Sequence, residues 1–230
     1  MKTTALIVAA GNSVRFGGEL PKQFFMVAGA PLLAWTIVRF EMAQRIDDIV
    51  LVVAEDRLGL VLDSINEGQR PTKVVKAVAG GSTRQQSVLM GLESLPESTQ
   101  LVAIHDGARP LTSPYDIDAV IQAAEVEKAA ILASRVPDTV KKVADDYILA
   151  TLNRSDLWLA QTPQVFEREL ILEAHRRAAH EGIDVTDDAA LVEATGHKVR
   201  VVESTSLNMK VTTRDDLRIV ESLLKGSIDE

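Results

Sequence analysis

Short runs of Val, Ile and Leu alternate along this chain with longer segments whose apolar residues have helical spacing. We expect strands at residues 5–10, 48–54, 74–79, 101–105, 129–134 and 199–203. We expect helices at residues 31–43, 57–66, 83–95, 114–128, 168–181, 187–195 and 214–225. Such strands are typical of a sheet covered on both faces. The pattern therefore predicts an α/β fold: a Rossmann-like, twisted, mostly parallel sheet with helices on both faces.

One region departs from this alternation. Residues 138–154 read as two short strands around the turn Asp145-Asp146, which predicts a projecting β-hairpin arm. We expect one domain over residues 1–230 that carries this arm, because a chain of 230 residues fits a single large core. A two-stranded hairpin is marginally stable alone, so the arm must pack on its own domain or on another chain.

Composition excludes several classes of site. The chain has no cysteine, which excludes disulfides, thiol nucleophiles, Cys-ligated zinc and iron–sulfur clusters. A net charge of -8 argues against a nucleic-acid partner. The longest uncharged stretch, residues 24–38, is interrupted by Gly29 and Pro31 and is shorter than the ~18 residues of a membrane span. We expect a soluble, cytoplasmic protein without membrane contact.

A glycine-rich segment, residues 11–18, follows the first expected strand. Backbone N–H groups of such a loop can enclose phosphate oxygens, and Arg15 and Lys22 add positive charge. The segment matches neither the phosphate loop of ATPases nor the dinucleotide-binding fingerprint. Taken alone, it leaves open a plain strand-to-helix turn with surface cations.

Further motifs follow this loop in a characteristic order. They are Ala9-Ala10-Gly11, Pro21-Lys22-Gln23-Phe24, Gly80-Gly81-Ser82-Thr83-Arg84, His105-Asp106-Gly107-Ala108-Arg109-Pro110, Val136-Pro137-Asp138-Thr139-Val140-Lys141, Gln161-Thr162-Pro163-Gln164, Thr186-Asp187-Asp188-Ala189 and Asn208-Met209-Lys210-Val211-Thr212. Over residues 5–217 this set resembles the 2-C-methyl-D-erythritol 4-phosphate cytidylyltransferases of the non-mevalonate isoprenoid route.

The resemblance implies that a sugar-alcohol phosphate attacks the α-phosphate of CTP with Mg²⁺ present. The nucleophile is already an anion, so the reaction needs positioning and positive charge rather than a general base. The implied catalytic residues are Arg15, Lys22, Arg154 and Lys210. The implied nucleotide-binding residues are Ala9, Ala10, Gly11, Gly80, Gly81, Ser82, Ser87 and Asp106. The implied substrate-binding residues are Asp106, Arg109, Thr139, Arg154, Thr162, Thr186 and Lys210.

Asp106 is also the candidate Mg²⁺ ligand, because Mg²⁺ takes few protein carboxylates beside phosphates and water. The resemblance further implies a homodimer in which the arm crosses to the second subunit, so that Thr139 and Arg154 complete the partner's site. Related chains often carry an acidic residue where this one has Ser82-Thr83, which leaves the cytosine contacts open.

At several positions an ordinary structural role competes with the functional one. Arg84 could be a solvated surface cation, and Lys210 an edge-strand lysine. Ser82 and Thr186 are candidate helix caps, as are Ser113 and Thr213. His105 is expected to be a packed strand-end residue rather than a base.

Two other functions compete with the implied one. A ribitol-5-phosphate cytidylyltransferase is the nearest, and Ala9-Ala10-Gly11 argues against it. A noncatalytic nucleotide-sensing module would tolerate loss of Arg15 or Lys22, and both are present. For an acidic chain that binds a triphosphate, we expect the positive potential to be confined to one cleft.

Overall fold

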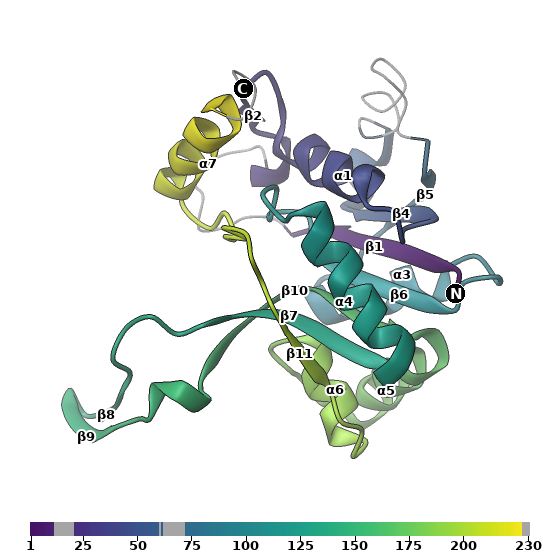
Figure 1. Cartoon of the computed structure of the whole chain (residues 1–230). Coiled ribbons are helices and arrows are strands. Elements are labelled where there is room, and N and C mark those ends of the chain that lie inside the picture. The colour runs from purple at the N-terminus through teal and green to yellow at the C-terminus, as the bar shows by residue number, and fades with distance from the viewer. Residues whose placement is uncertain (12–20, 60, 62–71, 227–230) are drawn as a thin grey trace.

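The computed structural model describes residues 1–11, 21–59, 61 and 72–226. A seven-stranded sheet with the order β11-β7-β10-β6-β1-β4-β5 forms its centre (Figure 1). Its strands are β1 (Thr3–Ala9), β4 (Asp48–Val53), β5 (Val74–Ala79), β6 (Leu101–Asp106), β7 (Ala129–Arg135), β10 (Trp158–Glu167) and β11 (Arg200–Glu203). Neighbours are parallel except where β10 is involved. The predicted mostly parallel α/β sheet is confirmed.

The helices largely follow the predicted ranges. They are α1 (Leu32–Met42), α3 (Arg84–Glu93), α4 (Pro114–Glu127), α5 (Arg168–Glu181), α6 (Asp188–Ala194) and α7 (Arg214–Gly226). The short turns η2 (Lys22–Phe24), η3 (Glu55–Arg57) and η4 (Arg154–Asp156) accompany them, and β2 (Met26–Val27) pairs with β3 (Ala30–Pro31). The predicted helix over 57–66 lies mostly outside the described residues.

Strand β10 is the main departure from the predicted topology. It runs antiparallel between β6 and β7, in the middle of the sheet. No strand was predicted there, because the segment contains Pro163 and two glutamines and lacks a continuous apolar run. Its register with β7 shifts between Ala160 and Gln164, so polar and small residues are accommodated at an irregularity. The strand brings Thr162 beside the end of β6.

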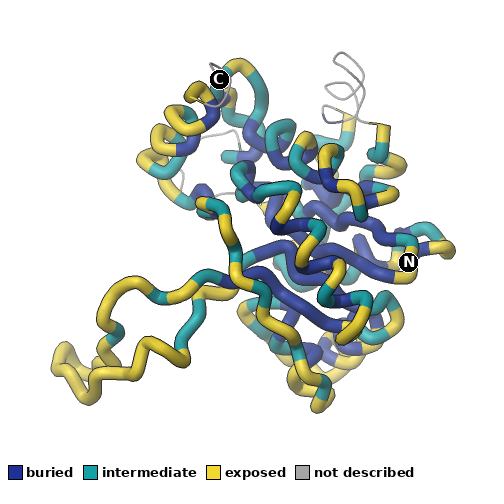
Figure 2. Tube along the Cα trace, in the orientation of Figure 1, coloured by how far each residue is buried: buried dark blue, intermediate teal, exposed yellow. Residues whose placement is uncertain are grey.

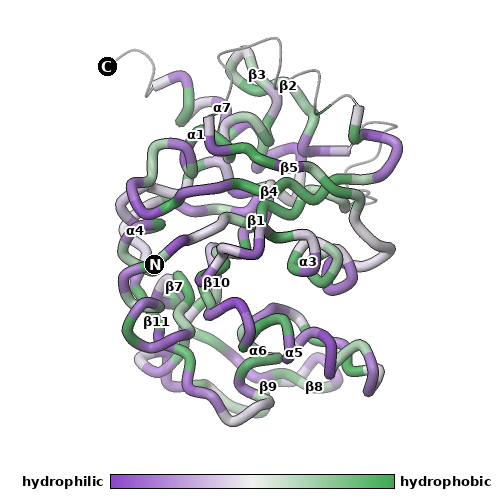
Figure 3. The backbone as a smooth tube through the Cα atoms, turned by 90° about the vertical axis from the view of Figure 1, so that its right-hand side faces the viewer, coloured by the Kyte–Doolittle hydropathy of each residue, from purple (hydrophilic) through white to green (hydrophobic). Residues whose placement is uncertain are grey.

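Helices cover both faces of the sheet. One layer packs α1 and α4 through residues such as Phe40 and Ile121 against Ile7 of β1. The other packs α3, α5 and α6 against Leu6, the neighbouring residue of the same strand. Successive side chains of a strand point to opposite faces, so one strand contributes to two cores. Figures 2 and 3 show the strands buried and hydrophobic at the centre of the molecule.

A smaller cluster joins the C-terminal helix to this body. Val220 and Leu224 of α7 pack with Val27, Leu32 and Val211. The predicted cap at Thr213 is confirmed: its hydroxyl accepts a hydrogen bond from the Asp216 N–H at 3.2 Å, and the Asp216 carboxylate accepts one from the Thr213 N–H. In the part of the chain that the structure describes, no helix is long and apolar enough to cross a membrane.

The arm projects away from the sheet (Figure 1). Strands β8 (Lys141–Ala144) and β9 (Tyr147–Thr151) form a separate two-stranded sheet. The turn residues Asp145 and Asp146 have φ values of 48° and 63°, the left-handed conformation that tight hairpin turns require. All residues of both strands are exposed, as Figure 2 shows. Nothing in the described part of the chain packs beneath the arm to stabilise it.

Candidate active site

A cleft of about 690 Å³ opens where β1, β5 and β6 end. The carboxyl ends of parallel strands are the usual ligand-binding edge of such sheets. Nine of the predicted site residues line it: Ala10, Gly11, Lys22, Gly80, Gly81, Ser82, Ser87, Asp106 and Lys210. Its described lining contains the cations Lys22, Arg84 and Lys210 against the carboxylates Asp106 and Glu55. The cleft is therefore locally cationic in a chain whose net charge is -8.

Asp106, the last residue of β6, is the centre of the charged network. Its Oδ2 lies 2.7 Å from Lys210 Nζ and 3.7 Å from Arg109 Nε. Its Oδ1 lies 3.1 Å from Arg84 Nε. Burial opposes the charge of this carboxylate, but the surrounding cations outweigh burial and hold the pKa of Asp106 well below its usual range. Asp106 is therefore an anion at neutral pH and fixes the positions of the cations around it.

Thr162 holds the backbone of Asp106 and also contacts His105. The Thr162 hydroxyl accepts a hydrogen bond from the Asp106 N–H at 3.1 Å and lies 3.0 Å from His105 Nδ1. Burial lowers the pKa of His105 to about 3, so the ring is neutral at physiological pH. His105 is thus a packed strand-end residue, as expected from the sequence.

Arg84 is not a solvated surface cation. It begins α3, and two carboxylates hold it: Asp106, and Asp188 at 2.7 Å from its Nη2. Burial opposes its charge, but both carboxylates outweigh burial and raise its pKa. Asp188 is itself buried and lies 3.1 Å from His175 Nε2. Sequence reasoning assigned no role to Asp188 or His175, because their partners lie on other elements; the paired aspartates after Thr186 were the available signal.

Lys22, in the turn η2, also lines the cleft. Its ammonium donates a hydrogen bond to the Val211 carbonyl at 2.6 Å, next to Lys210 in sequence. Two cations from opposite ends of the chain are therefore held by one short segment. The predicted partner of Lys22 in the first loop, Arg15, lies outside the described residues.

The glycine pair at the end of β5 is required by close packing. A Cβ on Gly80 would lie 2.4 Å from Ala10 Cβ and 2.8 Å from Ser87 Oγ. Ser87 is buried, and its hydroxyl donates to the Thr83 carbonyl at 2.8 Å. Gly80 thus lets the end of β5 approach Ala10, which follows β1, and Ser87 of α3.

Two predicted caps are displaced by one residue. Helix α3 is capped by Thr83, whose side chain accepts from the Gln86 N–H, and not by Ser82. Helix α6 is capped by Asp187, and not by Thr186. The predicted cap at Ser113 is confirmed, because its hydroxyl accepts from the Tyr115 N–H. Ser82 instead bonds the Gln86 side chain through both its N–H and its hydroxyl.

The remaining predicted site residues do not line this cleft. Ala9 and Thr162 are buried, Arg109 is largely buried, and Thr186 is exposed beside α6. Thr139 and Arg154 are exposed at the base of the arm, where Arg154 donates to the Pro137 carbonyl. A second cavity of about 420 Å³ there is lined by Arg135, Pro137 and Arg154. The chain therefore separates the predicted site into a cleft and an arm.

The described residues contain no group of three His, Asp or Glu side chains that could hold a metal. Asp106 offers a single carboxylate to the cleft, with its oxygens already paired to cations. This donor set fits a Mg²⁺ ion that takes most of its ligands from phosphates and water, and it does not fit a metal held by protein ligands alone.

Comparisons with known proteins agree on one family. The family model described as 2-C-methyl-D-erythritol 4-phosphate cytidylyltransferase matches residues 3–226. The chain is similar to proteins of that name from Desulforamulus reducens, with 46% identity over 96% of this chain and 95% of the relative, and from Syntrophus aciditrophicus, with 42% identity over 97% and 96%.

Solved structures give the same result. The 4-diphosphocytidyl-2C-methyl-D-erythritol synthase of Anaerococcus prevotii superposes with a TM-score of 0.86 at 32% identity, covering 97% of this chain and 96% of that one. The 2-C-methyl-D-erythritol 4-phosphate cytidylyltransferase of Thermus thermophilus superposes with a TM-score of 0.78 at 33% identity, covering 98% and 100%.

Proposed function

Because the chain belongs to the 2-C-methyl-D-erythritol 4-phosphate cytidylyltransferase family, we propose that it transfers CMP from CTP to 2-C-methyl-D-erythritol 4-phosphate, giving 4-diphosphocytidyl-2-C-methyl-D-erythritol and pyrophosphate. Family membership makes it a cytidylyltransferase. The observation that carries the specific proposal is the cationic cleft around Asp106, in which Lys22, Arg84 and Lys210 converge.

The step is a direct in-line displacement. A phosphate oxygen of the alditol phosphate bonds to the α-phosphorus of CTP as the bond between that phosphorus and the bridging oxygen breaks, and the electron pair leaves with pyrophosphate. The nucleophile already carries negative charge, so no side chain has to remove a proton. Repulsion between two anions opposes the reaction, and fixed cations reduce it.

In this proposal, residues at different positions in the site have different roles. Ala10, Gly11, Ser87 and the Gly80–Ser82 turn bind the nucleotide, with Ala9 packed behind them. Lys22 and Arg15 stabilise the charge that develops at the α-phosphate, and Lys210 with Arg109 holds the incoming phosphate. Thr162 acts by supporting Asp106, and Thr186 would contact a substrate hydroxyl.

Mg²⁺ is the proposed cofactor, and Asp106 with the nucleotide phosphates would hold it. When bound, the ion neutralises part of the triphosphate charge. Asp106 also orients Lys210 in the chain itself, through the 2.7 Å ion pair.

We place the second half of the site on the arm of a partner subunit. Four arm residues, Val143, Tyr147, Ile148 and Leu149, are more than half exposed, which is unfavourable for an isolated hairpin and favourable for a homodimer contact. Thr139 and Arg154 at the arm base would then reach the partner's cleft. Neither nucleic acid nor membrane has a part in this function.

Pyrophosphate release tests the proposal. The purified protein is incubated with CTP and Mg²⁺ and with either methylerythritol phosphate or ribitol 5-phosphate. We expect release with methylerythritol phosphate and the appearance of its cytidine diphosphate adduct. Release with ribitol phosphate alone would overturn the substrate assignment, and CTP binding without release from either would favour a nucleotide-sensing module.

A further inference from the structure

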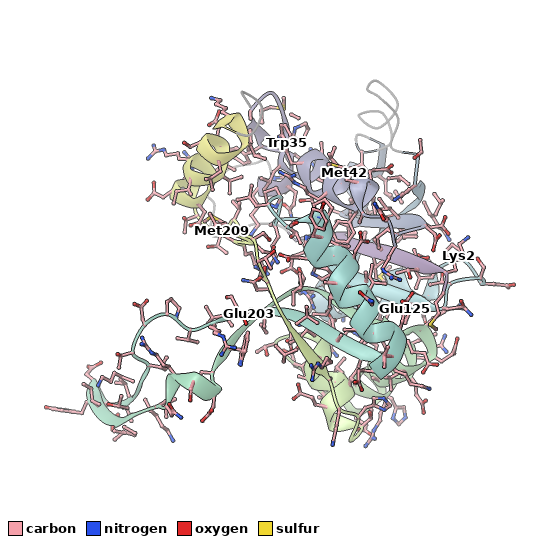
Figure 4. All side chains as sticks on the ribbon, viewed as in Figure 1. Lys2, Trp35, Met42, Glu125, Glu203 and Met209 are labelled. Carbon is pink, nitrogen blue, oxygen red and sulfur yellow. The ribbon has the colours of Figure 1, made fainter. Side chains whose placement is uncertain are left out.

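The segment that joins β11 to α7, residues 204–212, lies along the loop between β6 and α4. We call it the strap. Figure 4 labels Glu203, the last residue before the strap, and Met209 within it. The Val211 N–H donates to the Ala108 carbonyl at 2.9 Å. The strap carries Lys210, which pairs with Asp106, and the Val211 carbonyl, which accepts from Lys22. The positions of two cleft cations therefore depend on it.

Asn208 is the buried anchor of the strap, with 1% of its surface exposed. Its Oδ1 accepts from the Thr112 hydroxyl at 2.6 Å. Its Nδ2 donates to the Thr162 carbonyl at 2.8 Å and to Gln161 Oε1 at 3.0 Å. An amide has a donor and an acceptor end, and both are used here. Asn208 thus ties the strap to β10 and to the loop after β6 at once.

The backbone of Asn208 completes the connection to the charged network. Its carbonyl accepts from Arg109 Nη1 at 2.6 Å, and the Nε of the same guanidinium lies 3.7 Å from Asp106. The Thr162 residue that Asn208 holds also bonds the Asp106 N–H. One buried side chain therefore sets Arg109 and Lys210 relative to Asp106 without lining the cleft.

The start of the strap is fixed separately. Asp116 of α4 is buried, and its carboxylate accepts hydrogen bonds from the backbone and hydroxyl groups of Thr205 and Ser206 and from the Ser204 hydroxyl. Burial opposes its charge, but these donors outweigh burial and lower its pKa. Because this end is held, loss of Asn208 loosens the strap locally, at Lys210, without releasing it from the fold.

We propose that Asn208 is a positioning residue for the nucleotidyl transfer: it holds Arg109 and Lys210 where the incoming phosphate binds. The proposal rests on the proposed function of these two cations. The proposal predicts that binding of the alditol phosphate depends on Asn208 more than binding of CTP does, because none of the contacts described for Asn208 involves Ala10, Gly11 or the Gly80–Ser82 turn.

Kinetics of Asn208→Ala test this prediction. We expect the KM for the alditol phosphate to rise at least about tenfold and kcat to fall, while the KM for CTP stays within about twofold. The matched control is Thr99→Val. It removes a buried hydrogen bond of 2.7 Å to Thr4 at the opposite end of β1 and β6, and should leave both KM values unchanged.

Thr112→Val is the milder variant, and it carries the test if Asn208→Ala does not fold. It removes only the hydroxyl that bonds Asn208 Oδ1 and the Arg109 carbonyl and preserves the shape of the residue. We expect the same pattern at about a third to a tenth of the size. Equal changes in the KM of both substrates, or no change in either variant, would overturn the proposal.

Acetylation of Lys210 by acetic anhydride, followed by peptide mass spectrometry, gives a readout without turnover. We expect Lys210 to react at least about threefold faster in Asn208→Ala or Thr112→Val, because its charge-assisted contact with Asp106 is loosened, and Lys76 to react at an unchanged rate. Unchanged Lys210 reactivity would overturn the positioning role. If the wild type transfers no CMP, the proposed function fails, and this labelling still decides the role of Asn208.

Discussion

The cations that we assign to one reaction lie in two regions. One is the floor of the cleft, by which we mean Asp106 and the cleft cations Lys22, Arg84 and Lys210; the other is the arm. The two regions are built in opposite ways. On the floor, Asp106 is 8% exposed and is held by three cations and by Thr162. On the arm, Arg154 is exposed and its described hydrogen bond is to the nearby Pro137 carbonyl. One half of the proposed site is therefore organised by contacts within a single chain, whereas the other half is an exposed hairpin that, in our proposal, acts against a second subunit.

Loss of Lys22 from the floor of the cleft should have the largest effect on activity. For Lys22→Ala we expect kcat/KM to fall about 10³-fold, because a cation aimed at the transferring phosphate is removed. Steady-state pyrophosphate release measures this loss. Lys76→Ala, on the exposed edge strand β5, is the control and should retain full activity. Wild-type turnover by Lys22→Ala would refute the assigned role.

Loss of the arm arginine should reduce activity without affecting the fold. For Arg154→Ala we expect kcat/KM to fall about 10²-fold, because one cation at the phosphate is lost. The free energy of unfolding should change by less than about 0.5 kcal/mol, because the side chain is exposed. Lys142→Ala, also on the arm, is the control. If Arg154→Ala lowered stability and activity together, the arm would belong to the organised half.

Acid should lower the free energy of unfolding, because His105 is buried as a neutral ring. The folded pKa of His105 is about 3, whereas an unfolded histidine has a pKa of ~6.5. Below pH 6.5 the unfolded chain binds a proton that the folded chain does not bind until about pH 3, so stability falls over that window. Urea unfolding at pH 7 and pH 5 should show the wild type losing about 1–2 kcal/mol more than His105→Gln.

Asp106 contributes in a separate window. Its folded pKa is depressed, so its stabilisation is present above the unfolded value of ~3.9 and is lost at lower pH. Measurements at pH 5 and above therefore isolate His105. Equal losses in the wild type and in His105→Gln would contradict the assignment of a neutral, buried ring.

The smallest effect is expected at the tip of the arm. Asp146 has a positive φ, which glycine adopts without strain, so Asp146→Gly should favour the turn by less than about 1 kcal/mol. Hydrogen exchange of the arm amides should slow slightly, while the global free energy of unfolding stays constant. A change in global stability would show that the arm is coupled to the core.

The sequence predicted the parts of this molecule that depend on local pattern. Runs such as 48–54 and helical periods such as 168–181 appear almost as expected, since their burial is encoded along the chain. Strand β10 was missed because a central antiparallel strand with Pro163 lacks the apolar run used to recognise strands. Asp188, His175 and Asn208 were assigned no role from the sequence because their partners lie on other elements of the fold.

Family motifs named the cations that we expect to act, but not how they are arranged. Lys22, Asp106 and Lys210 meet in one cleft, as the resemblance implied. Arg154 and Thr139 stay outside it, and no pattern in a single chain can reveal the position of a second copy. Cations from both ends of the chain therefore line this cleft, whereas the predicted confinement of positive potential to it stays a prediction.

Complementation between two inactive variants tests most directly whether the arm acts in the partner's site. Lys22→Ala and Arg154→Ala chains are dissociated, mixed in equal amounts and reassociated. Half of the resulting dimers then combine one intact floor with one intact arm, and pyrophosphate release should recover to about a quarter of the wild-type rate per chain. No recovery above the separate variants, in a sample shown to contain mixed dimers, would place each arm in the site of its own chain and contradict this account.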